Sequence, residues 1–283
     1  MLTTLKRAFF LWSVFLTVAS ASAEALPQRP FTHPERVRYD GQCLTIDGRD
    51  ILIFSGSFHY FRCPKELWPE RFAKIKAAGF NCVETYIPWN ISERSAPKNL
   101  NDFSQVNLHD FEAWLNMAEK AGLYIIARPG PYICAEWDRG GYPGWLITKR
   151  PASFHEWTWL RTDDPDYIAW ARHWYRAVMP TIARHQITRK APGQTGVILV
   201  FLENEYDHYT MKLPQRIAAM KALTKEALAQ GIDVPLATCE TACVNGSQDS
   251  ILLKSTVEGL YVSFSTFSRI LRKSHELTSS FGA

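Results

Sequence analysis

Two carboxylic acids and an amide directly follow an apolar run in the segment VFLENEYD, which spans residues 200–207. Glu203 and Glu205 flank Asn204, and side chains along a strand alternate between its two faces. The two acids are therefore expected on one face and Asn204 on the other, unless the backbone bends where the strand ends. Because the preceding residues are apolar, this pattern favours a buried strand that delivers acids to a site. The alternative is a strand end that simply emerges into solvent.

Further polar and aromatic side chains are predicted at the ends of other strands. Glycoside hydrolysis requires one carboxylic acid to protonate the leaving oxygen and a second carboxylate to attack or stabilise the sugar cation, and hydrogen bonds to the 2-hydroxyl assist it. The pattern therefore predicts Glu205 as the acid/base, with the Asn204 amide beside it. No metal-ligand spacing accompanies these residues, so we expect neither a metal nor a cofactor. The predicted rim consists of His59, Tyr60, Glu84, Tyr86, Trp89, Asn90, Glu136, Trp137, Asn204 and Glu205.

Strands and helices must alternate to bring these residues together. Such an alternation predicts a parallel sheet with helices outside, either an open doubly wound sheet or a (β/α)8 barrel. The segment SGSFHYFR after the first strand lacks the glycine-rich phosphate loop of doubly wound sheets, and barrels carry functional residues at the carboxyl ends of their strands. The predicted fold class is therefore α/β, a (β/α)8 TIM barrel. Strands are predicted over residues 51–55, 82–87, 123–128, 197–202 and 234–238, with a sixth candidate at 260–264.

Three motifs in this order resemble glycoside hydrolase family 35, the β-galactosidases with a TIM-barrel catalytic domain. They are ETYIPWN, RPGPYICAEWDRGGYPGWL and ENEY, and the resemblance runs from about residue 54 to residue 206. It implies retaining hydrolysis of terminal non-reducing β-D-galactose in a β-galactoside oligosaccharide or glycoconjugate. It also implies that Glu205 is the acid/base and that Glu203 faces away from the sugar. The galactose pocket would be lined by Tyr86, Ile133, Cys134, Ala135, Glu136 and Asn204.

The chain departs from the family pattern beside the predicted acid/base. It has PGQTG where the family usually has Gly-Gly-Pro, Phe201 at the place of a glutamine, and Asp207 at the place of a glycine. These differences concern the leaving-group side of the pocket. An exo-β-glucosaminidase-like glycosidase is therefore the alternative activity.

The second carboxylate of the retaining mechanism is not identified in the sequence. The family places it at the end of the seventh strand, whereas the pattern predicts about five to six of the eight strands. The tail from residue 255 to 283 is rich in Ser and Thr and matches no family motif, which favours a truncated or frame-shifted product. Glu258 and Glu276 are its carboxylates, and Glu258 would be the nucleophile of a divergent short form. Without a nucleophile, the chain would be a non-catalytic galactoside-binding remnant.

The first 23 residues have the pattern of a secretory signal. Lys6 and Arg7 precede an apolar stretch at 8–19, and Ala21-Ser22-Ala23 provides the cleavage pattern. We therefore expect a secreted or periplasmic chain cleaved near Ala23, with a partial barrel domain at 24–254 and no membrane span. Loss of the two basic residues lowers the net charge from +4 to +2, which argues against nucleic acid as a partner. Six cysteines leave the disulfide pairing open, and the oligomeric state is also open.

Overall fold

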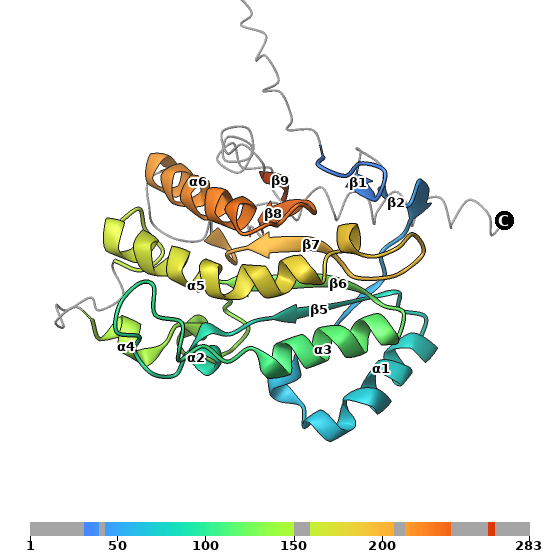
Figure 1. Ribbon diagram of the computed structural model, residues 1–283, viewed down its shortest axis with the longest axis horizontal. Helices are drawn as coiled ribbons and strands as arrows, with labels where there is room; N and C mark the ends of the chain where they lie inside the picture. Colours follow the sequence, from blue (N-terminus) through green and yellow to red (C-terminus); the bar gives the residue numbers. More distant parts are fainter. Residues whose placement is uncertain (1–30, 40–42, 150–158, 207–212, 239–259, 264–283) are drawn as a thin grey trace, which may run out of the picture.

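The chain forms one large parallel sheet and one small antiparallel sheet in the computed structural model (Figure 1). The structure describes residues 31–39, 43–149, 159–206, 213–238 and 260–263. The small sheet contains β1 (Val37–Tyr39), β2 (Leu44–Ile46) and β3 (Arg49–Ile51). The large sheet contains β4 (Ser55–Ser57), β5 (Cys82–Tyr86), β6 (Tyr124–Gly130), β7 (Val197–Leu202), β8 (Leu236–Thr238) and β9 (Leu260–Ser263).

Adjacent strands of the large sheet pair in sequence order and in parallel, from β4 to β9. Such an arrangement is that of a (β/α)8 barrel, and its six strands fit an incomplete barrel, as predicted. The register places Ser57 opposite Glu84 and, two residues further along β5, Tyr86 opposite Arg128. Polar side chains of three strands therefore lie in adjacent layers near the carboxyl ends of these strands. The carboxyl ends of β5, β6 and β7 all lie at one edge of the sheet (Figure 1).

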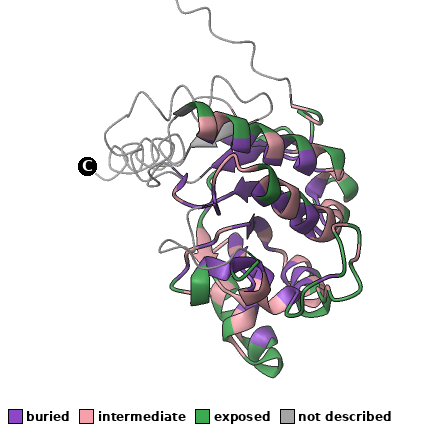
Figure 2. Ribbon diagram, turned by 90° about the vertical axis from the view of Figure 1, so that its left-hand side faces the viewer, coloured by how far each residue is buried: buried purple, intermediate pink, exposed green. Residues whose placement is uncertain are grey.

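Amphipathic helices cover the outside of this sheet. In α3, the apolar residues at helical spacing, Phe111, Trp114, Leu115 and Ala118, are all buried. Exposed residues lie on the outer faces of the helices and buried residues on the faces toward the strands (Figure 2). The helices are α1 (Trp68–Ala77), α2 (Trp89–Ser92), α3 (His109–Lys120), α4 (Gly144–Ile147), α5 (Pro165–Arg184) and α6 (Leu213–Ala229), with 3-10 turns at Tyr60–Arg62, Lys65–Leu67, Asp138–Gly141 and Ile187–Arg189.

Helix α5 connects the outer layer to the site edge of the sheet. Asp164 begins the helix as its N-cap and accepts hydrogen bonds from two backbone N–H groups, and Pro165 occupies the first turn. From the middle of the helix, Trp174 donates to the carbonyl of Pro129 at 2.7 Å and the Tyr175 hydroxyl donates to the carbonyl of Gly130 at 2.6 Å. Both bonds tie the end of β6 to α5 and help to satisfy its backbone carbonyls.

The predicted first strand is wrong in its position. Residues 51–55 were expected to form it because they are apolar, but β3 ends at Ile51 and the barrel strand begins at Ser55. Leu52 and Phe54 between them are 50% and 51% exposed, and the Phe54 ring stacks on Phe80 with centroids 4.2 Å apart. The apolar run is therefore a connection between the two sheets and not a buried strand.

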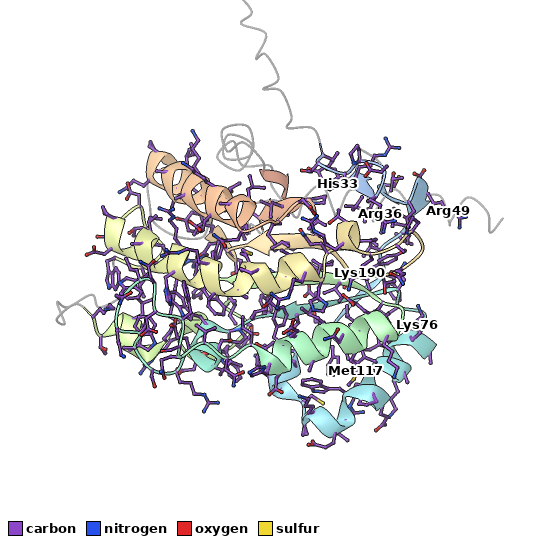
Figure 3. All side chains as sticks on the ribbon, viewed as in Figure 1. His33, Arg36, Arg49, Lys76, Met117 and Lys190 are labelled. Carbon is purple, nitrogen blue, oxygen red and sulfur yellow. The ribbon has the colours of Figure 1, made fainter. Side chains whose placement is uncertain are left out.

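The small sheet closes the amino end of the barrel strands. Arg36 donates to the carbonyl of Ile187 at 2.8 Å and pairs with Asp47 at 2.5 Å. Lys190 on the neighbouring loop pairs with Glu119 at 2.6 Å, and Figure 3 shows Arg36 and Lys190 at this end of the molecule. These contacts stand at the opposite end from the carboxyl edge, so they stabilise the barrel without reaching the predicted site.

No helix among the described residues is long and apolar enough to cross a membrane. Cys63, Cys82 and Cys134 are free thiols, whereas Cys239 and Cys243 lie outside the described residues. Residues 1–23 also lie outside them, as does the tail from 255 except for Leu260–Ser263. The signal peptide, its cleavage near Ala23 and the truncated tail therefore remain predictions.

Candidate active site

The backbone bends where β7 ends, and the strict alternation of side chains stops there. Glu203 and Glu205 have φ angles of 60° and 48°, in the left-handed region that side chains other than glycine rarely adopt. Each such residue costs on the order of 1–3 kcal/mol, which the surrounding contacts must offset. As a result the two acids do not share an environment, since Glu203 is fully buried and Glu205 is partly exposed.

The Glu203 carboxylate belongs to a buried ion pair. Arg161 donates to its Oε2 through Nε at 3.1 Å and NH2 at 2.9 Å, and the Tyr167 hydroxyl donates to Oε1 at 3.3 Å. Burial raises the pKa of the Glu203 carboxyl, and the Arg161 guanidinium opposes that rise. The two bonds from Arg161 fall on one oxygen and are charge-assisted, which favours the ionised carboxylate. The structure thus places Glu203 in a structural role, away from the residues predicted to bind sugar.

Asn204 faces a different group of side chains. Its Oδ1 accepts hydrogen bonds from Arg128 NH2 at 2.7 Å and from the Tyr86 hydroxyl at 3.3 Å. Since an arginine can only donate, the amide oxygen must face Arg128, and the amide NH2 is left to donate elsewhere. The Arg128 guanidinium lies over the rings of Tyr86 and Phe201, 4.5 and 5.1 Å from their centroids. Tyr86 is therefore not a core residue but one wall of this cluster.

Glu84 provides the negative charge that pairs with Arg128, the residue that bonds Asn204. Its Oε2 lies 3.6 Å from Arg128 NH1, and its Oε1 accepts a hydrogen bond from the Ser57 hydroxyl at 2.6 Å. Ser57, Glu84, Arg128 and Asn204 come from four consecutive barrel strands or their ends. A polar network that joins four strands fixes the orientation of the amide at its end.

The second predicted motif, RPGPYICAEWDRGGYPGWL, forms a tight left-handed turn after β6. Cys134, Ala135 and Glu136 have φ angles of 53°, 58° and 46°. Arg62 donates to the carbonyls of Ala135 and Glu136, which ties this turn to the loop after β4. Ile133 and Ala135 are buried, Cys134 is half-buried and Glu136 is exposed. Trp137 follows the turn and donates from Nε1 to Asn90 Oδ1 at 3.0 Å.

The two arginines near Glu136 in the sequence, Arg128 and Arg139, are paired with other acids. Arg128 pairs with Glu84, and Arg139 lies 3.9 Å from Asp138. The exposed carboxylate of Glu136 is thus placed at the surface of the turn, on the same edge of the barrel as Asn204 and Glu205. The nucleophile candidates Glu258 and Glu276 lie outside the described residues, as does His208.

The structure also brings residues to this edge that sequence reasoning did not assign to the pocket. His59 was predicted at the rim but not in the sugar pocket, and its ring lies 5.2 Å from that of Tyr86 and 5.4 Å from that of Phe61. Glu84 was predicted only as a rim residue, and Arg128 was not among the predicted site residues. For Glu84 the sequence does contain a signal, since Glu84 and Tyr86 are two residues apart on one strand and share its face.

The environment of His59 should make folding stability depend on pH. Burial, followed by the charge of Arg62, lowers the pKa of His59 from 6.5 to about 4. Between pH 6.5 and 4 the unfolded chain therefore binds more protons than the folded chain. The stability that the neutral His59 ring contributes is present above pH 6.5 and is lost as the pH falls toward 4. Because the His59 ring is partly exposed, we expect this shift to lower the free energy of unfolding by about 1–2 kcal/mol over that pH range.

Urea unfolding of the native chain and His59→Gln at pH 7 and pH 4.5 measures this contribution. The substitution should reduce the loss of unfolding free energy between the two pH values, whereas His109→Gln, at an exposed site on α3, should leave it unchanged. Equal pH dependence in the native chain and His59→Gln would contradict the assignment.

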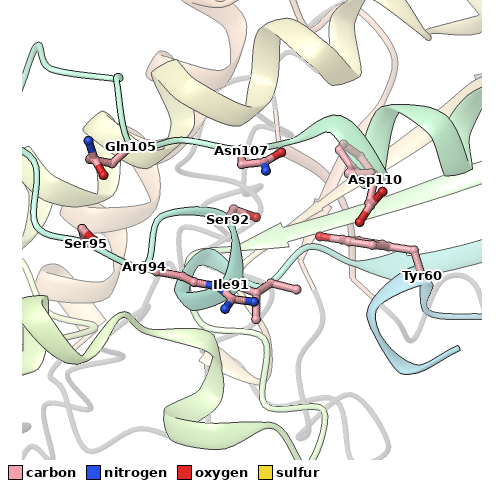
Figure 4. Close-up of a pocket in the computed structure, with 9 residues that line it drawn as sticks. Tyr60, Ile91, Ser92, Arg94, Ser95, Gln105, Asn107 and Asp110 are labelled. Atoms are coloured by element: carbon pink, nitrogen blue, oxygen red, sulfur yellow. The ribbon is translucent and has the colours of Figure 1, made fainter. Parts of the chain in front are cut away.

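A separate pocket of about 420 Å³ lies between the loops after β4 and β5 and the start of α3. Figure 4 shows Asp110 directly above Tyr60 on one side of it, with the Tyr60 ring extending toward Ser92 and Asn107. Asp110 is already paired with Lys65 at 2.8 Å. Tyr60 belongs to both regions, because its chain neighbours His59 and Phe61 contact Tyr86 and Trp137. This pocket therefore adjoins the predicted galactose pocket but does not contain Asn204 or Glu205.

Comparisons with known proteins agree with this architecture. The family model described as glycosyl hydrolases family 35 matches residues 43–275. The beta-galactosidase of Canis lupus familiaris is 33% identical over 254 residues, which are 89% of this chain and 34% of that protein. The human beta-galactosidase is 36% identical, over 83% of this chain and 32% of its own length. A beta-galactosidase-1-like protein 3 from Rattus norvegicus is 43% identical, over 58% of this chain and 24% of its own length. The chain thus spans at most about a third of these relatives.

Two solved structures show the same fold at low sequence identity. The endo-1,4-beta-mannanase of Rhizomucor miehei superposes with a TM-score of 0.50 and 13% identity, over 83% of this chain and 68% of that one. The protein GH5_18 from Streptomyces cattleya, solved in complex with GlcNAc, has a TM-score of 0.51 and 12% identity, over 68% and 45% of the two chains. At such identities the likeness concerns the fold alone.

Proposed function

Since the chain belongs to the glycosyl hydrolases of family 35, we propose that it acts on terminal non-reducing β-D-galactose residues of β-galactosides, with Glu205 as the acid/base. The observation that carries this proposal is the fixed amide of Asn204. Arg128 and Tyr86 hold its oxygen, so its NH2 group is available to donate to a sugar hydroxyl immediately beside Glu205. Hydrogen bonds to the 2-hydroxyl of the sugar strengthen in the transition state of glycoside hydrolysis.

In the proposed reaction, Glu205 protonates the glycosidic oxygen as the bond to the anomeric carbon breaks. A second carboxylate, roughly 5–5.5 Å away, attacks the same carbon in a retaining enzyme. Water then releases the sugar with Glu205 acting as the base. Tyr86, Glu136 and the backbone of Cys134 and Ala135 would hold the galactose, and Glu258 is the proposed nucleophile of a short form. Export of the chain after cleavage near Ala23 is part of the same proposal.

The substrate class can be tested with three aryl sugars on the purified chain. We expect turnover of 4-nitrophenyl β-galactoside above that of the β-glucosaminide and β-glucoside. Preference for the glucosaminide would replace the proposed sugar by that of the alternative, an exo-β-glucosaminidase-like activity.

Calorimetric titration with galactose separates an enzyme from a binding remnant. Turnover together with galactose binding supports the proposal, whereas binding without turnover supports a non-catalytic galactoside-binding chain. A folded chain that shows neither heat at millimolar galactose nor turnover of any of the three substrates would exclude both.

A further inference from the structure

Arg161 holds three consecutive residues of the turn that carries Glu205. Besides its two bonds to the Glu203 carboxylate, its NH2 group donates to the carbonyl of Asn204 at 2.5 Å and to that of Glu205 at 3.3 Å. Arg161 is buried, and its guanidinium lies 3.9 Å from the centroid of the Tyr132 ring. One planar group thus fixes both a side chain and two backbone carbonyls, which suits the fork of donors that arginine provides.

The arginine is itself held in place by the segment that it binds. The Tyr206 hydroxyl donates to the carbonyl of Arg161 at 3.2 Å, and Arg161 has a φ angle of 59°. On the other side, Glu203 donates its N–H to the carbonyl of Gly130 at 2.9 Å. The turn after β7 is therefore clamped between β6 and the loop before α5. These contacts offset the left-handed conformation of Glu203 and Glu205, which the chain would otherwise not adopt.

We propose that Arg161 is the positioning residue of the proton-transfer step: by holding the carbonyls of Asn204 and Glu205, its guanidinium aims the Glu205 carboxyl at the glycosidic oxygen. This inference rests on the proposed function, because the role of Glu205 is part of it. Arg161 binds the backbone carbonyl of Asn204, whereas the amide oxygen of the Asn204 side chain is bonded by Arg128 and Tyr86. Its loss should therefore affect proton transfer more than the binding of galactose.

The variant Arg161→Lys separates positioning from simple charge. Lysine retains the positive charge, but its compact ammonium group cannot serve the Glu203 carboxylate and two carbonyls in the same geometry. We expect kcat/KM for lactose, whose leaving group needs a proton, to fall about tenfold to a hundredfold, the scale of a misplaced functional group. For 2,4-dinitrophenyl β-galactoside, whose leaving group departs without a proton, kcat/KM should change by less than about threefold because general acid catalysis contributes little there.

The matched control is Arg172→Lys. Arg172 pairs with Glu226 at 2.6 Å between α5 and α6, outside the candidate site. Both substrates should react with this variant as with the native chain. An equal loss for the two leaving groups in Arg161→Lys would show a general structural role and overturn the proposal.

Hydrogen exchange provides a readout that does not depend on activity. In Arg161→Lys, amide exchange in the peptide covering residues 199–206 should accelerate at least about tenfold, because local opening of the turn costs less free energy. Peptides from α3, and all peptides of Arg172→Lys outside the α5–α6 contact, should exchange as in the native chain. If the native chain cleaves neither substrate, the proposed function fails, and exchange alone decides whether Arg161 fixes the turn. Unchanged exchange at residues 199–206 would refute it.

Discussion

Glu205→Gln is expected to reduce kcat/KM for lactose by about 10²–10⁴-fold, the usual contribution of general acid catalysis. Glutamine has the size of glutamate and fits the left-handed turn equally well, but it cannot give a proton to the leaving oxygen. Steady-state turnover of lactose and of 2,4-dinitrophenyl β-galactoside measures the effect, which should be much larger for lactose. Galactose affinity should stay close to that of the native chain, because Asn204 and its partners are untouched.

The control for this prediction is Glu70→Gln on the exposed surface of α1, where the carboxylate contacts only Lys74 and Arg71 among the described residues. It should turn over both substrates normally. Full lactose turnover by Glu205→Gln would mean that the proton comes from another group and that the assignment of Glu205 is wrong.

Glu93→Ala is expected to lower the free energy of unfolding by about 3–5 kcal/mol, the usual cost of leaving one member of a buried ion pair unpartnered. The Glu93 carboxylate lies 2.9 Å from Nε2 of His173 and accepts a bond from Trp89 Nε1 at 2.7 Å, and all three side chains are buried. The other nitrogen of His173 lies 3.0 Å from the carbonyl of Leu100. Removal of the carboxylate would orphan both donors and leave a cavity beside Trp89.

Urea unfolding at pH 7 measures this loss. Glu93→Gln should be less destabilising, because an amide retains an acceptor for one of the two donors. Glu70→Ala is the exposed counterpart, and its i,i+4 pair with Lys74 should be worth only about 0.3–0.5 kcal/mol. If Glu93→Ala were no more destabilising than Glu70→Ala, the buried pair would not be an element of stability.

Strands β6 and β7 of the parallel sheet were predictable because they are buried on both faces and therefore consist largely of apolar runs. The fourth predicted strand, residues 197–202, coincides with β7, all six of whose residues are buried. The small sheet escaped prediction because its strands have three residues each, too few to show a period of two. The apolar run that contains Leu52 and Phe54 was wrongly predicted as a strand, because a sequence does not show whether an apolar residue is exposed or buried.

The sequence predicted which residues lie at the site but not how they are arranged in space. Asn204, Glu205 and Tyr86 were placed at strand ends by position alone, and the structure brings them to one edge. Neither the left-handed turn at Glu203 nor the Arg161 ion pair has a local sequence signal, because both depend on contacts between distant segments. His59 was predicted at the rim but not in the sugar pocket, because its contact with Tyr86 joins residues from the ends of two different strands. The roles of Tyr86, Ile133, Cys134, Ala135, Glu136 and Asn204 in sugar binding remain predictions.

The long-range bonds that hold Asn204 have a consequence for the order of events in folding. Its partners are 118 residues away in Tyr86 and 76 residues away in Arg128, and Arg161 is 43 residues away. Closing such separations is slow compared with forming a helix from local contacts. After dilution from denaturant, far-ultraviolet circular dichroism should therefore recover before the capacity to bind galactose. The time course of galactose binding would then report the last pairing steps of β5, β6 and β7.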